Sequence, residues 1–167
     1  MISLQPHTGS YYAASANEIP DYSPLQGAKS SDVCVIGAGF TGLSAALHLA
    51  ERGFKVHVIE ANKVAWGASG RNGGQMIGGI SGENRISKSL GANGESIVWD
   101  MRWKGHQIIR ERVETYGIQC DLKSGYLDVA IKPRHVQGLE AEFTKLKRYN
   151  FPFEIKLLSK QEIRDTI

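Results

Sequence analysis

The order of hydrophobic and polar positions predicts two buried strands joined by a helix. Residues 33–36 form a continuous apolar run of mostly β-branched residues, which is typical of a strand buried on both faces of a parallel sheet. Apolar residues then recur at helical spacing from about residue 41 to 52, and Gly53 supplies a helix stop. A second strand follows over residues 55–60 and ends in Glu60. We therefore expect an α/β fold with a Rossmann-like βαβ unit.

The pattern after residue 94 predicts mainly helices. Apolar positions recur at helical spacing over residues 95–116 and again over 136–149. Between them, residues 125–131 alternate in the manner of a strand. Near the end of the sequence, Ser159 and Glu162 have the spacing of a capping box and predict the start of another helix.

A glycine-rich turn joins the first strand of the unit to its helix. Gly37 permits the tight turn, Gly39 lets the backbone approach a pyrophosphate, and Gly42 lets the helix pack close to the sheet. Phosphates bind at a helix amino terminus because free N–H groups and the positive end of the helix dipole lie there. The acid at the end of the second strand can accept hydrogen bonds from ribose hydroxyls. The residues expected to bind a dinucleotide here are Gly37, Gly39, Phe40, Thr41, Gly42, Glu60 and Ala61.

The residues after the second strand limit the kind of dinucleotide. Glu60 is followed by Ala61 and Asn62, with no arginine beside them to compensate a ribose 2′-phosphate. This disfavours NADP. FAD and NAD share the fingerprint, however, so the βαβ unit leaves both open.

A second glycine-rich block, GASGRNGGQ at residues 67–75, follows closely. A flexible linker would be polar on both sides, but Trp66 precedes this block and the apolar stretch MIGGI follows it. Its small residues allow close backbone approach, while Arg71, Asn72 and Gln75 supply directional donors. We therefore expect a backbone packed against a planar, polar cofactor.

These motifs together resemble a known family. The series DVCVIGAGFTGLSAALHLAERGFKVHVIEA followed by GASGRNGGQ resembles the amino-terminal third of the D-amino-acid oxidase superfamily of FAD enzymes. Within it, SYYAASAN at residues 10–17, ASGRNGGQ and IIRERVETYGIQCD at residues 108–121 are most similar to the gamma-glutamylputrescine oxidoreductases. By that resemblance, the further FAD contacts are Ser69, Arg71, Asn72, Gly73, Gly74 and Gln75.

The resemblance also implies a reaction and a domain plan. It implies an FAD-dependent oxidoreductase that oxidises a small amine by hydride transfer to the flavin, giving an aldehyde, ammonia and hydrogen peroxide. Residues 1–30 would be an amino-terminal arm, residues 31–94 the FAD-binding segment, and residues 95–167 a helical segment that begins an α+β substrate domain. Because members of the family are more than twice as long, we expect an amino-terminal part with an incomplete core, inactive by itself.

Residues outside these motifs suggest no catalytic centre. The histidines are isolated, so the catalytic residues are unknown, and Trp99 and Trp103 are expected to serve packing. An NAD-dependent dehydrogenase and a noncatalytic dinucleotide-binding module stay open as alternatives.

Composition and charge exclude several other classes. The chain of 167 residues has 20 basic and 17 acidic side chains, and its basic residues are interleaved with acids, so we expect no nucleic-acid partner. It has no run of 18 apolar residues and no secretory signal pattern, so no membrane span is expected. Cys34 and Cys120 lie far apart, which indicates neither a disulfide nor a metal site and favours the cytoplasm.

The arm is expected to be mostly irregular, with tyrosines that dock on the body or on a partner.

Overall fold

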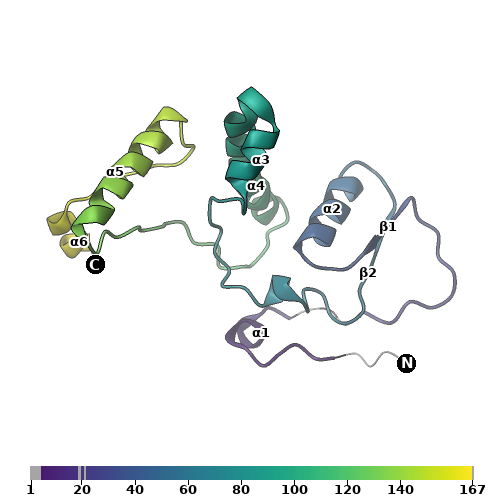
Figure 1. The fold of residues 1–167 in the computed structure, drawn as a ribbon. Helices are drawn as coiled ribbons and strands as arrows, with labels where there is room; N and C mark the ends of the chain where they lie inside the picture. The colour runs from purple at the N-terminus through teal and green to yellow at the C-terminus, as the bar shows by residue number, and fades with distance from the viewer. Residues whose placement is uncertain (1–4, 19, 21, 167) are drawn as a thin grey trace. The chain divides into compact units, whose positions relative to one another are not determined.

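The computed structural model describes residues 5–18, 20 and 22–166. The chain divides into two compact units, residues 1–75 and residues 76–167, and each is described by itself. Figure 1 shows the strands in the first unit and the long helices in the second. The predicted functional boundary at residue 94 stays a prediction, whereas the packing of the chain divides after residue 75.

The first unit contains the predicted βαβ arrangement. Strand β1 spans Val33–Ile36, helix α2 spans Phe40–Ala50 and strand β2 spans Val56–Ile59. The strands are parallel and pair in register from Val33 with Val56 to Ile36 with Ile59. The expected strand–helix–strand order is therefore confirmed, with boundaries within two residues of the pattern.

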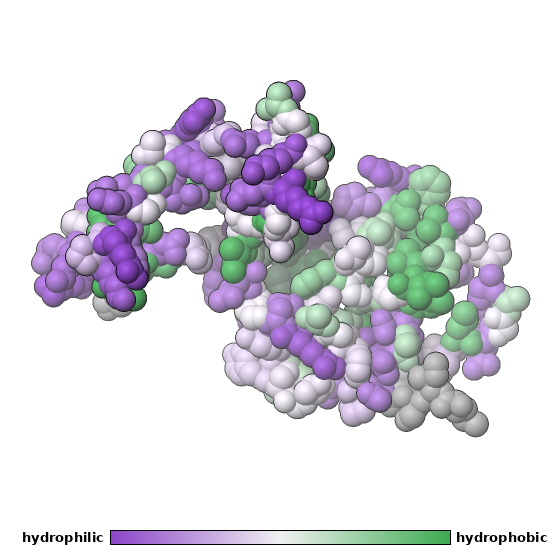
Figure 2. Space-filling view, in the orientation of Figure 1, coloured by the Kyte–Doolittle hydropathy of each residue, from purple (hydrophilic) through white to green (hydrophobic). Residues whose placement is uncertain are grey.

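The prediction that the first strand is buried on both faces is wrong. Its burial alternates: Val33 and Val35 are half-buried, while Cys34 and Ile36 are exposed. The cause is the small size of the sheet. Among the described residues it has two strands and packs against α2, so its other face is left uncovered. Ile36 is consequently 84% exposed, and Figure 2 shows hydrophobic side chains at the surface over β1.

The described part of the arm is mostly irregular, as expected, and contains one short helix. A short helix, α1, spans Tyr11–Ser15, and the Ser10 hydroxyl accepts a hydrogen bond from the Ala13 amide at its amino terminus. This is the side-chain cap that a serine commonly provides. Further along the first unit, a 3-10 turn, η1, covers Ala68–Gly70 within the second glycine block.

The second unit is helical. Its elements are α3 (Glu83–Ser89), the 3-10 turn η2 (Gly91–Asn93), α4 (Gly94–Thr115), α5 (Pro133–Arg148) and α6 (Lys160–Thr166). The expected helices over 95–116 and 136–149 correspond to α4 and α5. The capping box is also confirmed, because the Glu162 amide donates to Ser159 Oγ and the Ser159 amide donates to Glu162 Oε2. Helix α3 was not predicted.

The strand expected over residues 125–131 does not form. The structure shows irregular backbone there, and Tyr126 and Ile131 are 79% and 78% exposed. An alternating pattern becomes a strand only when a neighbouring backbone pairs with it. In the described part of the second unit no strand is available for that pairing.

Aromatic side chains form the core of the second unit. Trp99 is buried and stacks on Tyr149, with ring centroids 4.9 Å apart, and the Tyr149 hydroxyl donates to Glu95 Oε2. Trp103 meets Phe151 edge to face at 4.7 Å. The expectation that Trp99 and Trp103 serve packing is confirmed. None of the described helices is long and apolar enough to cross a membrane.

Two glycines of α4 provide a matched test of the contact between α3 and α4. A Cβ on Gly94 would lie 1.8 Å from the Ser87 carbonyl oxygen of α3, whereas a Cβ on Gly105 would meet nothing within 4 Å. We expect Gly94→Ala to lower the free energy of unfolding by about 1–3 kcal/mol through overpacking. Gly105→Ala should raise it by roughly 0.5–1 kcal/mol because alanine favours the helix. Thermal and urea unfolding followed by circular dichroism measure both changes, and equal effects of the two variants would contradict this account of the α3–α4 contact.

Candidate cofactor-binding site

The turn after β1 requires glycine at two positions. Gly37 has a φ of +101°, a left-handed conformation that favours glycine, and its amide donates to the Ile59 carbonyl at 2.7 Å. A Cβ on Gly42 would lie 2.0 Å from the Gly37 carbonyl oxygen and 3.2 Å from Val35 Cγ1. Helix α2 therefore begins in direct contact with the turn and with the strand beneath it.

The amino terminus of α2 presents backbone donors. The first amides of any helix have no intrahelical acceptor, and the positive end of the helix dipole lies beside them. Here the Phe40 N–H donates to Ser69 Oγ at 2.9 Å. Within the described chain, no protein acceptor is found for the amides of Thr41 and Gly42, so they are available to an anionic ligand such as a phosphate.

Glu60 lies at the carboxyl end of β2, against the glycine-rich turn. Its Oε2 accepts a hydrogen bond from the Ala38 amide at 2.8 Å, and its Oε1 accepts one from the Asn62 amide at 3.1 Å. These two donors, the Ala38 amide first, hold the pKa of Glu60 below its usual value. The side chain is exposed and a carboxylate has about four acceptor sites. The carboxylate is thus fixed in its charged form with capacity for further donors such as ribose hydroxyls.

The second glycine block is packed against the first. Besides the bond from Phe40 to Ser69, the Ala65 amide donates to the Ala38 carbonyl at 2.9 Å. Gly70 is fitted closely, because a Cβ there would lie 2.3 Å from the Ala65 carbonyl oxygen. The block is therefore no linker, as its sequence indicated.

Side chains within the second block hold its own backbone. Asn72 Nδ2 donates to the Ser69 carbonyl at 2.7 Å, and Asn72 Oδ1 accepts from the Gly74 amide at 2.8 Å. The Arg71 guanidinium lies over the Trp66 ring, 4.5 Å from its centroid, and Arg71 Nε donates to the Trp66 carbonyl. Gly73 and Gln75 are exposed at the end of the block. Arg71 and Asn72 are thus partly used in shaping the loop.

The structure brings together Gly39, Phe40, Glu60 and Ser69 at the turn and the amino terminus of α2. Two further residues, which are not among the predicted contacts, support this arrangement: the Asn62 amide donates to Glu60 Oε1, and the Ala65 amide donates to the Ala38 carbonyl of the turn. Asn62 lies two residues after the strand-ending acid, a signal that could have indicated it, since asparagine commonly shapes tight turns. The left-handed backbone of Ala65, with a φ of 57°, had no signal in the sequence.

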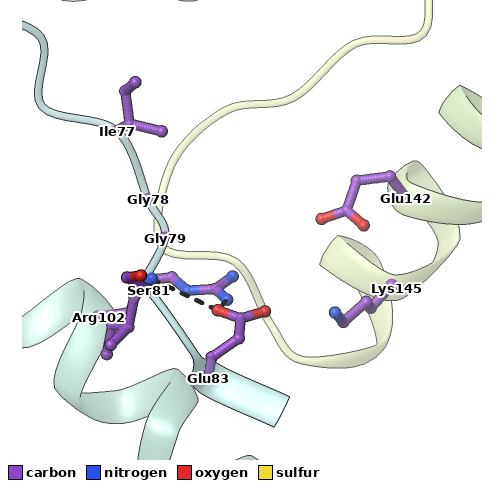
Figure 3. Close-up of a pocket in the computed structure, with 9 residues that line it drawn as sticks. Ile77, Gly78, Gly79, Ser81, Glu83, Arg102, Glu142 and Lys145 are labelled. Carbon is purple, nitrogen blue, oxygen red and sulfur yellow. Dashed lines mark hydrogen bonds and ion pairs between the residues drawn. The ribbon is translucent and has the colours of Figure 1, made fainter.

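A separate polar pocket lies within the second unit and contains none of the predicted cofactor residues. It has a volume of about 520 Å³, and Figure 3 shows Glu142 and Lys145 of α5 on one side with Glu83 and Arg102 on the other. Glu83 and Arg102 form an ion pair, and the hydrogen bond from Arg102 lowers the pKa of Glu83. Two acids and two bases balance each other here, so we regard the pocket as an ion-pair cluster and place the cofactor site in the first unit.

No group of histidine, cysteine and acidic side chains suited to a metal is found among the residues described. Cys34 and Cys120 are both exposed and unpaired.

The fold is that of a Rossmann-like βαβ unit with backbone donors and an acid at one end, and comparison with known proteins identifies the family. The family model of DAO, described as FAD dependent oxidoreductase, matches residues 32–167. The chain belongs to this family of FAD dependent oxidoreductases.

Several curated relatives are similar to the chain. It is 44% identical to the gamma-glutamylputrescine oxidoreductase of Escherichia coli (strain K12), over 95% of this chain and 37% of the relative. It is 44% identical to the probable oxidoreductase OrdL of Haemophilus influenzae, over 91% of this chain and 35% of that protein, and 32% identical to the OrdL of Rhizobium meliloti, over 86% and 34%. The chain therefore spans about a third of the length of these relatives. No solved structure matches it.

The hydrogen bonds to Glu60 predict how its ionisation affects stability. Because its folded-state pKa lies below the usual 4.5, the carboxylate contributes stability at pH values above the unfolded pKa. That contribution should disappear as the pH falls through the lowered folded-state value. A carbon-detected NMR titration of the Glu60 carboxyl measures the pKa directly, and Glu60→Gln should remove this part of the acid dependence of unfolding. A measured pKa at or above 4.5 would contradict the two backbone donors.

Proposed function

We propose that the protein binds FAD with the glycine-rich turn and the second glycine block of its first unit. The phosphates would meet the amino terminus of α2, where the amides of Thr41 and Gly42 lie beside the positive end of the helix dipole. Glu60 would accept hydrogen bonds from the ribose hydroxyls. The remaining contacts would come from the block: Ser69, Arg71, Asn72, Gly73, Gly74 and Gln75.

The observation that supports this proposal best is the direct junction of the two glycine-rich segments. The Phe40 amide binds Ser69 Oγ, and the Ala65 amide binds the Ala38 carbonyl, so both segments can contact one extended ligand. An NAD-dependent dehydrogenase would leave the second block without a role. The match of residues 32–167 to a family of FAD dependent oxidoreductases also favours FAD.

We further propose that the protein takes part in the oxidation of a small amine. The relative from Escherichia coli is named for gamma-glutamylputrescine, which makes this compound the first substrate to test. When bound, FAD would supply the two-electron acceptor. The net reaction would convert the amine, oxygen and water to the aldehyde, ammonia and hydrogen peroxide. Residues of this chain would bind and orient the cofactor, and none is assigned a catalytic step. The exposed, unpaired cysteines are compatible with a cytoplasmic location, which is part of the proposal.

Gly39 gives the sharpest test of cofactor binding. A Cβ there would lie 2.9 Å from Ser69 Oγ, so loss of FAD from Gly39→Ala has two explanations, a clash with the serine or crowding of the phosphates. We expect Gly39→Ala to purify without flavin and the double variant Gly39→Ala/Ser69→Ala to remain colourless, because the Cβ still occupies the phosphate position. Ser69→Ala alone should retain FAD with roughly threefold weaker affinity, as one hydrogen bond is lost. Flavin absorbance after purification and dilution measures all three.

If the double variant held FAD as tightly as Ser69→Ala, the glycine would serve the packing of Ser69 and the phosphate assignment would fail. A wild-type protein that retains NAD and no flavin would overturn the proposed cofactor.

The substrate proposal is tested separately. Anaerobic addition of gamma-glutamylputrescine to a yellow protein extended to the length of the relatives should bleach the flavin bands, and admission of air should restore them with one hydrogen peroxide formed per amine consumed. Putrescine without the glutamyl group is the matched control and should bleach more slowly. Unchanged flavin bands with the glutamyl compound would contradict the assigned substrate.

A further inference from the structure

The amino-terminal arm lies outside the region that matches the family model, yet it contacts the segment expected to hold the cofactor. The Gln5 amide donates to Asn62 Oδ1 at 3.1 Å, and Trp66 Nε1 donates to the Pro6 carbonyl at 3.0 Å. Each bond joins residues more than fifty positions apart in the sequence. The beginning of the described arm is therefore fixed to the chain that follows β2.

Helix α1 extends this contact to the far end of the glycine block. The Ser10 cap starts the helix, and Tyr12 then lies against Gly73, where a Cβ would be 3.8 Å from the tyrosine hydroxyl. Tyr11 lies beside it at a ring distance of 5.7 Å but is 78% exposed, whereas Tyr12 is 44% exposed. Residues 5–12 thus run alongside the segment from Asn62 to Gly73.

Trp66 connects the arm to a residue of the proposed site. The edge of its indole donates to the Pro6 carbonyl, while its face carries the Arg71 guanidinium at 4.5 Å. Arg71 Nε is bound to the Trp66 carbonyl at 3.0 Å as well. The orientation of the indole therefore decides where the Arg71 side chain lies.

We propose that residues 5–12 contribute to the cofactor site by positioning the residues that contact the cofactor. Through Pro6 and Tyr12, these residues hold Trp66, Arg71 and Gly73 in the shape that the cofactor needs. A glycine-rich segment loses much conformational freedom when it is ordered, so contacts that order it before binding strengthen binding. Pro6 and Tyr12 are positioning residues in this proposal. The part that concerns FAD rests on the proposed function, whereas the docking of the arm does not.

Fluorine NMR of protein labelled with 5-fluorotryptophan tests the docking without cofactor. The chain has three tryptophans, and the Trp66 resonance is assigned by its absence from Trp66→Phe. Removal of residues 5–16 should shift the Trp66 resonance in the apoprotein, because the indole loses its acceptor, and should leave the resonances of Trp99 and Trp103 unchanged. The same deletion should speed FAD release about tenfold, the factor expected for the loss of roughly two net hydrogen bonds.

Point variants separate Tyr12 from its neighbour. Tyr12→Ala should speed FAD release about threefold, and Tyr12→Phe should speed it nearly as much, since the hydroxyl is the Tyr12 atom that lies against Gly73. Tyr11→Ala is the matched control and should leave release unchanged. All variants are compared by the fluorescence of released flavin on dilution.

Each alternative outcome overturns a definite part of the proposal. An unchanged Trp66 resonance after the deletion would overturn docking of the arm. A shifted resonance with unchanged FAD release would overturn its role in the site. A wild-type protein without flavin would overturn the proposed function and the role of the arm in it, and the fluorine spectrum would still decide whether the arm is docked.

Discussion

The close approach of helix α2 to the turn after β1 is the constraint on which the first unit depends. Gly42 lies so near the Gly37 carbonyl that no side chain fits between them. This contact sets the amino terminus of the helix directly beyond the end of the strand, where its free amides and dipole are concentrated. The pairing of β2 with β1, continued by the bond from the Gly37 amide to the Ile59 carbonyl, brings the end of β2 beside the same turn, so the Glu60 carboxylate can reach the Ala38 amide. The amide donors and the acid therefore both depend on the conformation of this turn.

The second glycine block depends on the first for its position. Ser69 uses the Phe40 amide as an anchor, and the block then holds its own loop through Asn72 and through Arg71 over Trp66. Such a segment has few apolar side chains, so hydrogen bonds and close backbone contacts must order it. Membership of the FAD dependent oxidoreductase family gives a reason for that order, since a large cofactor needs a preformed backbone surface.

The second unit shows a different balance of forces. Its order comes from aromatic packing around Trp99 and Trp103, and its two long helices, α4 and α5, begin and end close to where the hydrophobic period begins and ends. Many large apolar side chains remain exposed, including Met101 and Ile131. Since a helix forms its hydrogen bonds within itself, it can exist without a paired neighbour, whereas a strand needs another strand to complete its hydrogen bonds. The segment 125–131 illustrates this, because its pattern is that of a strand and its backbone is irregular.

The sequence by itself determined most of the local elements and the residue types of the candidate site. The hydrophobic periodicity and the helix-ending residues located β1, α2, β2, α4 and α5, because these signals arise from contacts between near neighbours. The spacing of Gly37, Gly39, Gly42 and Glu60 indicated a dinucleotide site. Only the tertiary structure decided which faces are buried, that Ser69 caps α2, that Ala65 joins its segment to the turn, and that the arm docks on Trp66. These features depend on groups brought together from distant positions, and no local pattern records which backbone groups will meet.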